Sequence, residues 1–285
     1  MLRAYLKLTK PGVMLGNLIT TIAGFLFASN GHINWLLFVT TTSGTALVIS
    51  SACVINNYLD QDIDSKMERT KNRPLVSGEV KPNLALLFGV VIGVLGILTL
   101  ILWTNWLVVG VGVFGFITYV WLYGALGKRR SVHGTLVGSV SGAAPILAGY
   151  VAATNSLDAT ALILFLILFF WQMPEFYSIS IYRKKEYAAA GVPVSSVVRG
   201  VAVTKSQIYM YTVLTVISIL ALALMSSAST MYFIIMLALS LYWLKVTFEG
   251  TSTKNDNVWA KRNFRMSLVL LVVFSILISI NPYLP

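Results

Sequence analysis

Charged side chains are scarce in this chain. Only 11% of its 285 residues are charged and 57% are hydrophobic, whereas about a quarter of the residues of an ordinary soluble domain carry charge. This imbalance argues against an ordinary soluble domain and predicts a membrane protein.

Cysteine and histidine are also rare. Cys53 is the single cysteine, which excludes an internal disulfide and a thiolate cluster. His32 and His133 are the only histidines, and no Ser/His/Asp or Cys/His set is evident. A mechanism that depends on a side-chain nucleophile of these kinds is therefore not predicted.

Long apolar runs dominate the sequence. A helix needs roughly twenty residues to cross ~30 Å of hydrocarbon, and none of the runs of about this length alternates like a barrel strand. They cover residues 13–29, 35–55, 84–103, 106–126, 136–153, 159–181, 207–228, 230–248 and 264–281. We predict an all-α membrane protein with about nine transmembrane helices in a single domain over residues 1–285.

The basic residues predict the orientation of these spans. All 21 lysines and arginines fall on the side of the N-terminus, and the opposite connections hold none. The positive-inside rule then predicts a cytoplasmic N-terminus and an external C-terminus. Arg3, Lys7 and Lys10 precede the first run, but no small-residue cleavage site follows it, so we expect an uncleaved span. Topology and anionic lipid headgroups account for the net charge of +11 without a nucleic-acid partner.

One polar stretch, VINNYLDQDIDSKMERTKNRPL over Val54–Leu75, directly follows the second run. A helix that begins near Trp35 reaches the cytoplasmic surface at about Asn56. If the helix continues, four side chains form an oxygen-rich stripe about 12 Å long, and Asp62 points elsewhere. The four side chains are those of Asn56, Asn57, Asp60 and Asp64.

Acids and bases in this stretch predict a lipid diphosphate site. Carboxylate and amide oxygens suit one or two Mg²⁺ ions, which share their ligands with substrate phosphates, and we predict metal ligation by Asn57, Asp60 and Asp64. The bases that follow can bind the same phosphates through charged hydrogen bonds. They are Arg69, Lys71 and Arg73. The alternative is a solvated loop whose charges neutralise one another, but the position at the membrane edge favours the site.

The same residues carry a family resemblance. Asn57, Asp60 and Asp64 resemble the N-(D/N)-x-x-D-x-x-x-D motif of the intramembrane UbiA-type prenyltransferases, and Arg69-Thr70 with Arg73-Pro74 resembles the RTxxRP run of their farnesyltransferase branch. Further matches to that branch cover LTKPGVMLGNLIT, KRRSVHGTLVGSVSGAAPILAGY and WQMPEFYSISIYRKKEYAAAGVPV. The resemblance extends over about residues 5–270.

This resemblance implies a fold and an activity. It implies nine helices that open to a cytoplasmic cap in a bacterial cytoplasmic membrane, with Mg²⁺ as cofactor and farnesyl diphosphate and heme b as substrates. The implied product is heme O, which would pass to heme A synthase or to terminal oxidase subunits. Catalytic roles are implied for Asn57, Asp60, Asp64, Arg69 and Arg73.

The acceptor half of the site is less regular. Quinone-forming relatives carry a second Asp-rich motif, whereas the segment RKKEY here offers only Glu186 among three bases. Such a segment is a poor metal site but suits the propionates of heme. Substrate contacts are predicted for Asn56, Lys71, Lys128, Arg129, Arg130, Glu175, Arg183, Lys184 and Glu186. The alternative for each base is a topological role alone.

Three further features keep two interpretations each. Glu175 stands where the family usually has histidine, and it either contacts substrate or pairs with Lys205 or Arg183. His133 contacts heme or, as we favour, is a solvated loop residue, and its distance from His32 across the membrane excludes a bis-histidine heme site. Gly138 and Gly142 serve close helix packing or leave space for a flat macrocycle.

Two other functional classes are less consistent with the sequence. A secondary transporter would place its acids near the bilayer midplane, whereas the acids of this chain lie at the cytoplasmic edge. A structural assembly factor would need no stripe of carboxylates. Labelled farnesyl diphosphate separates the three classes by product formation, uptake or neither.

Overall fold

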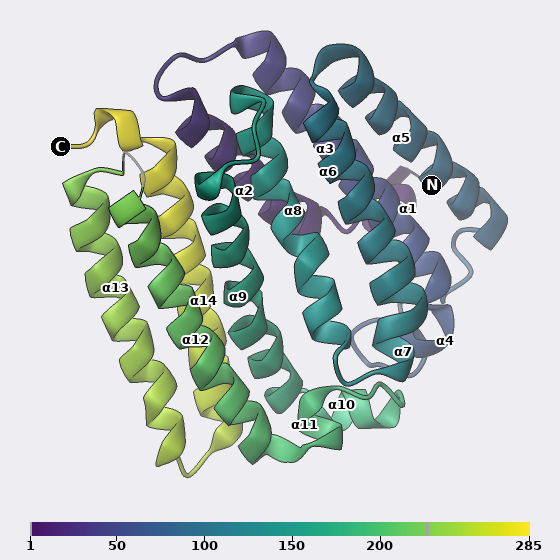
Figure 1. Cartoon of the computed structure of the whole chain (residues 1–285). Coiled ribbons are helices and arrows are strands. Elements are labelled where there is room, and N and C mark those ends of the chain that lie inside the picture. Colours follow the sequence, from purple (N-terminus) through teal and green to yellow (C-terminus); the bar gives the residue numbers. More distant parts are fainter. Residues whose placement is uncertain (1, 226–227) are drawn as a thin grey trace.

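The computed structural model describes residues 2–225 and 228–285, and in these ranges the chain is helical, without strands (Figure 1). Nine helical stretches there are long and apolar enough to cross a bilayer, so the predicted fold class is confirmed. They are α2 (Pro11–Ser29), α3 (Trp35–Leu59), α5 (Pro82–Trp103), α6 (Trp106–Ile117) with its continuation to Arg130, α8 (Gly134–Thr154), α9 (Ala159–Tyr182), α12 (Gly200–Met225), α13 (Thr230–Phe248) and α14 (Asp256–Ser279).

The apolar runs mark most helix boundaries well, but two helices begin earlier than predicted. α12 begins at Gly200 and α14 at Asp256, because both helices continue through polar residues beyond the hydrocarbon-length run. The Asn255 side chain caps α14 by accepting a hydrogen bond from the Val258 N–H at 3.2 Å. Residues 226 and 227 of the predicted span 207–228 lie outside the described ranges, and α12 ends at Met225.

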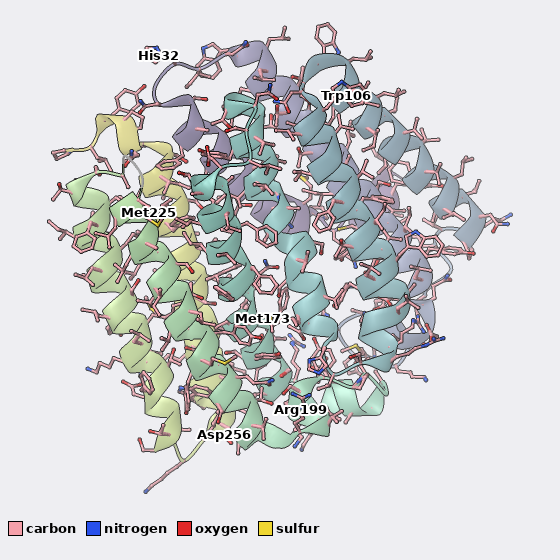
Figure 2. The ribbon with its side chains drawn as sticks, in the orientation of Figure 1. His32, Trp106, Met173, Arg199, Met225 and Asp256 are labelled. Atoms are coloured by element: carbon pink, nitrogen blue, oxygen red, sulfur yellow. The ribbon has the colours of Figure 1, made fainter. Side chains whose placement is uncertain are left out.

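The two ends of the bundle differ. His32 and Trp106 lie at one end in Figure 2, and Arg199 and Asp256 lie at the other. Four short helices gather at the second end, and the C-terminus lies at the first (Figure 1). The short helices are α4 (Gln61–Asp64), α7 (Lys128–Arg130), α10 (Lys184–Ala189) and α11 (Ser195–Val198). The end with the short helices is the one that the basic residues predict to be cytoplasmic, and that orientation stays a prediction.

Glycine residues allow the backbones of α2 and α8 to pack closely. A Cβ atom added to Gly149 would lie 1.9 Å from the Thr21 carbonyl oxygen, and one added to Gly24 would lie 2.2 Å from the Ile146 carbonyl oxygen. Only glycine leaves room for backbones this close, as is usual where membrane helices pack. The crossing holds the first transmembrane helix against the middle of the bundle.

Buried polar side chains tie α9, α13 and α14 together. Trp243 Nε1 and Thr247 Oγ1 donate hydrogen bonds to Asn263 Oδ1 at 3.1 and 2.8 Å. Asn263 Nδ2 donates in turn to Ser178 Oγ at 3.0 Å. Because every polar group in hydrocarbon needs a partner, this network favours one packing of the three helices. It holds α9 through Ser178, which does not line the cavity described below.

A π-helix, η1 (Thr118–Gly127), joins α6 to α7. Such stretches are rare and often lie at functional sites. Tyr119, Tyr123 and Lys128 from this region all line the same cavity.

Candidate active site

A cavity of ≈ 530 Å³ lies between α2, α3, α6, η1, α8 and α9. Its volume is within the ~300–1,000 Å³ range of small-molecule sites. Its inner walls are mainly apolar, and segment 187–194 borders its other end. The charged and amide side chains of that end are those of Lys10, Asn56, Asp60, Asp64, Arg69, Arg73, Lys128 and Arg183.

The predicted stripe survives a break between α3 and α4. The Asp60 N–H donates to the Asn56 carbonyl at 3.0 Å, and the Asp64 N–H donates to the Asp60 carbonyl at 2.8 Å. The helical spacing therefore continues past Leu59, and Asn56, Asp60 and Asp64 all line the cavity, at most 3% exposed. The Asp62 side chain is 60% exposed, so it points away as predicted.

Asn57 lies differently from its neighbour. It is buried, but its Nδ2 donates to the Leu8 carbonyl at 2.8 Å, and it does not line the cavity. Adjacent helical residues point about 100° apart, so Asn56 faces the cavity while Asn57 faces α1 (Leu2–Leu8). Metal ligation by Asn57 stays a prediction, and Asn56 is the amide that the structure brings to the two carboxylates.

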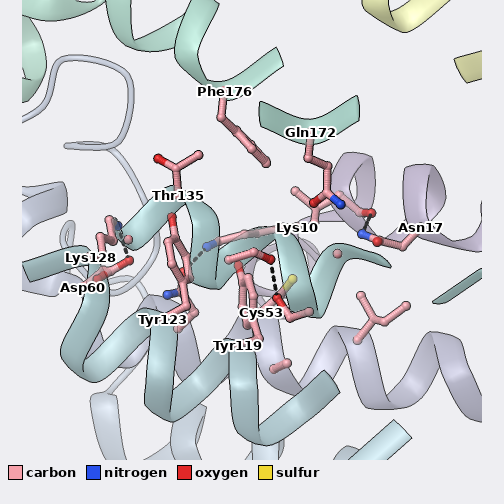
Figure 3. Close-up of a pocket in the computed structure, with 18 of the residues that line it drawn as sticks. Lys10, Asn17, Cys53, Asp60, Tyr119, Tyr123, Lys128, Thr135, Gln172 and Phe176 are labelled. Carbon is pink, nitrogen blue, oxygen red and sulfur yellow. Dashed lines mark hydrogen bonds and ion pairs between the residues drawn. The ribbon is translucent and has the colours of Figure 1, made fainter. Parts of the chain in front are cut away.

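Each cavity carboxylate has a basic partner. Arg73 Nη1 lies 2.5 Å from Asp64 Oδ2. Lys128 Nζ lies 2.6 Å from Asp60 Oδ2 (Figure 3). The second oxygen of Asp60, Oδ1, is buried and accepts no hydrogen bond within the described chain, although Arg129 Nη2 lies 3.8 Å away. Within each pair, the acid and the base neutralise each other. This pairing offsets part of the free-energy cost of withdrawing four charges from water.

The other predicted bases divide between cavity and surface. Arg69 lines the cavity and makes no salt bridge in the described ranges. Lys71 pairs with Glu68 at 2.6 Å on the surface, where the lysine side chain is 48% exposed. Of the three bases that follow the stripe, Arg69 and Arg73 reach the cavity.

Arg129 and Arg130 lie outside the cavity. Arg129 donates to both carboxylate oxygens of Asp62, at 2.8 and 2.7 Å. These hydrogen bonds lower the pKa of Asp62 to about 2. Arg129 Nη2 also lies 3.8 Å from Asp60 Oδ1. Arg130 is exposed, and Lys128 is the base of this run that lines the cavity.

The second basic segment contributes less. Arg183 lines the cavity and its Nη1 lies 2.9 Å from Glu186 Oε1. Lys184 is exposed and Glu186 does not line the cavity. Tyr187 supplies a cavity-lining ring instead.

The pairing predicted for Glu175 is wrong. Lys205 Nζ lies 2.5 Å from Asp256 Oδ1, and Arg183 pairs with Glu186. Glu175 has no hydrogen bond or ion pair with the described residues, and it does not line the cavity. Lys205 lies on α12 and reaches the start of α14, which accounts for its different partner.

His133 lies outside the cavity, whereas Gly138 and Gly142 line it. His133 is exposed, with its Nε2 3.1 Å from Arg199 Nη2, and it does not line the cavity. Gly138 and Gly142 line the cavity and also pack closely. Added Cβ atoms would lie 3.0 Å from Tyr123 Cδ2 and 1.9 Å from Gln172 Oε1, respectively.

Lys10 is a cavity residue that sequence reasoning treated only as a topological base. It has a left-handed backbone, φ 49°, directly before Pro11, and its Nζ donates to Asn56 Oδ1 at 2.5 Å. Burial lowers the pKa of Lys10 to about 8. The Lys-Pro step at the start of the first span was the available signal, because proline disfavours a helical conformation in the preceding residue.

Aromatic rings were also missed. Tyr119 and Tyr123 enter the cavity from η1, and Phe176 and Gln172 enter from α9 (Figure 3). Their spacing within apolar runs resembles that of ordinary lipid-facing residues. The sequence alone therefore carried no signal for them.

The donor set fits a shared metal rather than an all-protein cage. The described ranges contain no group of three or more His, Cys, Asp or Glu residues suited to a metal ion. Mg²⁺ commonly takes only one or two carboxylates and completes its shell with water and substrate phosphates. Asp60 and Asp64, with the Asn56 amide and an Asp60 Oδ1 that accepts no hydrogen bond within the described ranges, fit this arrangement.

The sequence is similar to a known family. Residues 17–269 match the UbiA prenyltransferase family. The chain is 45% identical over 285 residues to "Protoheme IX farnesyltransferase" of Photorhabdus laumondii, covering 100% of this chain and 97% of that one. It is 46% identical over 281 residues to the protein of the same name from Edwardsiella ictaluri, covering 99% and 95%.

Solved structures share the fold. A digeranylgeranylglyceryl phosphate synthase superimposes with a TM-score of 0.84 at 19% identity, covering 99% of this chain and 98% of that one. A UbiA homolog from Archaeoglobus fulgidus, bound to GPP and Mg²⁺, superimposes with a TM-score of 0.71 at 18% identity, covering 96% and 99%.

Proposed function

We propose, since the chain belongs to the UbiA prenyltransferase family, that it transfers the farnesyl group of farnesyl diphosphate to a vinyl group of heme b. Water adds in the same reaction, and the products are heme O and diphosphate. Relatives named for this activity, at 45% and 46% identity, support the assignment. The observation that carries it is a cluster of paired acids and bases at one end of an apolar cavity in a multi-pass membrane protein.

We assign a Mg²⁺ site to Asp60 and Asp64, with Asn56 and Asn57 nearby. The buried Asp60 Oδ1, which accepts no hydrogen bond within the described ranges, supports this assignment. Bound Mg²⁺ would supply positive charge that stabilises the departing diphosphate. The chain contributes two carboxylates held four residues apart, about one helical turn.

Basic side chains would bind the diphosphate itself. Arg73 and Lys128 already lie at the carboxylates, and Arg69 has no salt bridge in the described ranges that would compete with phosphate. Lys10, which directly precedes α2, adds a fourth cation. Arginine suits this role because its fork can donate two parallel hydrogen bonds to phosphate.

The apolar walls would bind the farnesyl chain and exclude water from the allylic cation. Breaking the bond between the allylic carbon and oxygen leaves positive charge on the hydrocarbon. The rings of Tyr119, Tyr123 and Phe176 border this space. Their electron-rich faces would attract that charge.

Heme b is the acceptor that we assign to the side of α9 and segment 183–194. Arg183 is the cavity-lining base suited to a heme propionate. An acceptor with its own negative charge agrees with a segment where Glu186 is one acid among three bases. We further propose that heme A synthase or terminal oxidase subunits receive the product.

Reconstitution tests this function. Purified protein in lipid bilayers, supplied with heme b, farnesyl diphosphate and Mg²⁺, is expected to yield hydroxyethylfarnesyl heme by mass spectrometry. A chelator should abolish product and added Mg²⁺ should restore it. Prenylation of 4-hydroxybenzoate or a naphthoate with heme unchanged would contradict the acceptor and leave only the family standing.

A further inference from the structure

The proposed reaction contains a hydration step, and the inference below rests on that proposed function. When the vinyl group attacks farnesyl carbon 1, its terminal carbon gains the new bond and its inner carbon is left with positive charge. Water must reach that carbon in a cavity whose walls otherwise exclude water. The competing fate of the cation is loss of a proton, which gives an alkene without a hydroxyl group.

Gln172 presents an oriented hydrogen-bond acceptor to the cavity. Its Nε2 donates to the Ser139 carbonyl at 3.2 Å and to the Leu168 carbonyl at 2.9 Å. Both neighbours of the nitrogen are acceptors, so the hydrogen bonds assign the two ends of the amide. Gln172 is only 5% exposed and lines the cavity, and its Oε1 accepts no hydrogen bond from the described ranges.

The residues beside Gln172 hold this part of α9 rigidly. Trp171 Nε1 donates to the Ser267 carbonyl at 2.8 Å, which ties α9 to α14. Ser139 Oγ donates to the Met173 sulfur at 3.1 Å, which ties α9 to α8. A side chain on a backbone held from both sides keeps its direction, as a positioning group must.

Gly142 leaves the space in which the Gln172 oxygen lies. A Cβ atom at Gly142 would lie 1.9 Å from Gln172 Oε1, so an alanine there would displace the amide. Gly142 itself lines the cavity. The oxygen therefore lies over a backbone position without a side chain, at the cavity wall.

Gln172 is a polar group in a mainly apolar part of the cavity. It is the deepest of the α9 residues that line the cavity, about 16 Å along the helix from Arg183. The diphosphate-binding groups lie at the charged end, and the apolar walls lie beyond. Gln172 therefore supplies a hydrogen-bond acceptor where the surrounding walls offer few places to hold a water molecule.

We propose that Gln172 positions the water molecule that hydrates the cation. A water hydrogen donates to Gln172 Oε1, which directs a lone pair of the water oxygen toward the inner vinyl carbon. The new carbon–oxygen bond forms as that lone pair is shared, and the proton lost from water passes to the released diphosphate. Carbon, oxygen, hydrogen and charge then balance without an oxidant or a reductant.

The experiment measures the ratio of hydroxylated to dehydrated farnesyl heme by mass spectrometry in reconstituted membranes. Gln172→Met removes the acceptor at similar size, and it is expected to lower this ratio roughly tenfold, the effect of one lost hydrogen bond. Ser141→Ala is the control, because Ser141 lines the same cavity but donates its hydroxyl to the Gly138 carbonyl at 2.7 Å within its own helix. Its ratio should stay at the wild-type value.

Gly142→Ala provides a test that leaves Gln172 in the sequence. The added methyl group displaces the amide oxygen, so the ratio should fall in the same direction as in Gln172→Met. Retention in the membrane shows which variants are folded.

The outcomes separate this proposal from the proposed function. A wild-type ratio in a folded Gln172→Met or Gly142→Ala variant, or an equal fall in Ser141→Ala, overturns the role of Gln172. Failure of the wild-type protein to farnesylate heme at all would instead overturn the proposed function.

Discussion

The polar segments that follow α3 and α9 lie at the same end of the bundle, but they differ in how many of their charged side chains enter the cavity. The segment after α3 sends Asp60, Asp64 and two arginines into the cavity. Among the charged side chains described in the segment after α9, Arg183 is the one that lines the cavity, and Lys184 and Lys185 are exposed.

The difference arises from helical continuity. Residues 60–64 continue the hydrogen-bond spacing of α3, so one face of a membrane helix extends into the cytoplasmic-end segment. The segment after α9 is broken into α10 and α11, and its apolar Ala190 and Val192 pack on Ile63 and Met67. Composition thus locates the functional end, while helical register decides which charges enter the site.

Reporter fusions test whether both segments face the same compartment, and their readout is all or none. Fusions after Gly78 and Gly191 should read as cytoplasmic, because the bases of both segments follow the positive-inside rule. A fusion after Asn155 should read as external. A cytoplasmic signal at Asn155 would contradict the topology and with it the pairing of the two segments.

Asp60→Ala and Asp64→Ala should each lower product formation by more than about 100-fold, because each removes a proposed metal ligand and leaves a base unpaired in the cavity. Asp62→Ala is the matched control in the same segment. Its exposed pair with Arg129 contributes little, so activity should stay within about twofold. Equal losses at all three positions would contradict the stripe.

Arg73 and Lys71 are two bases of the first segment, one in the cavity and one on the surface. Arg73→Ala should lower kcat/KM for farnesyl diphosphate by about tenfold to hundredfold, the effect of lost charged hydrogen bonds. Lys71→Ala should change it by less than about twofold, because Lys71 pairs with Glu68 on the surface. Equal effects would mean that Lys71 reaches the diphosphate in the bound state.

Arg183 and Lys184 should show the smallest effects, in the second segment. Arg183→Gln is expected to raise the KM for heme by about tenfold and to leave the KM for farnesyl diphosphate nearly unchanged. Lys184→Gln should change neither by more than about twofold, since its side chain is exposed. A larger effect at Lys184 would favour heme binding on the outer surface of α10.

The sequence predicted the features that depend on local periodicity. The lengths of the apolar runs gave the nine helices, and the spacing of Asn56, Asp60 and Asp64 gave the stripe. Contacts between distant segments were not predictable in the same way. The partner of Glu175 was predicted wrongly, and Lys10 and Gln172 were missed, because their surroundings depend on how α2, α8 and α9 pack.

The π-helix η1 has a consequence for insertions and deletions. Lys128 follows η1 directly, so its direction depends on the number of residues wound into that stretch. Loss of one residue there would turn everything beyond it by about 100° and carry the lysine away from Asp60, while the hydrophobicity of the span would hardly change. The loop at 30–34 should tolerate a change of length, but this apolar stretch has a fixed residue count.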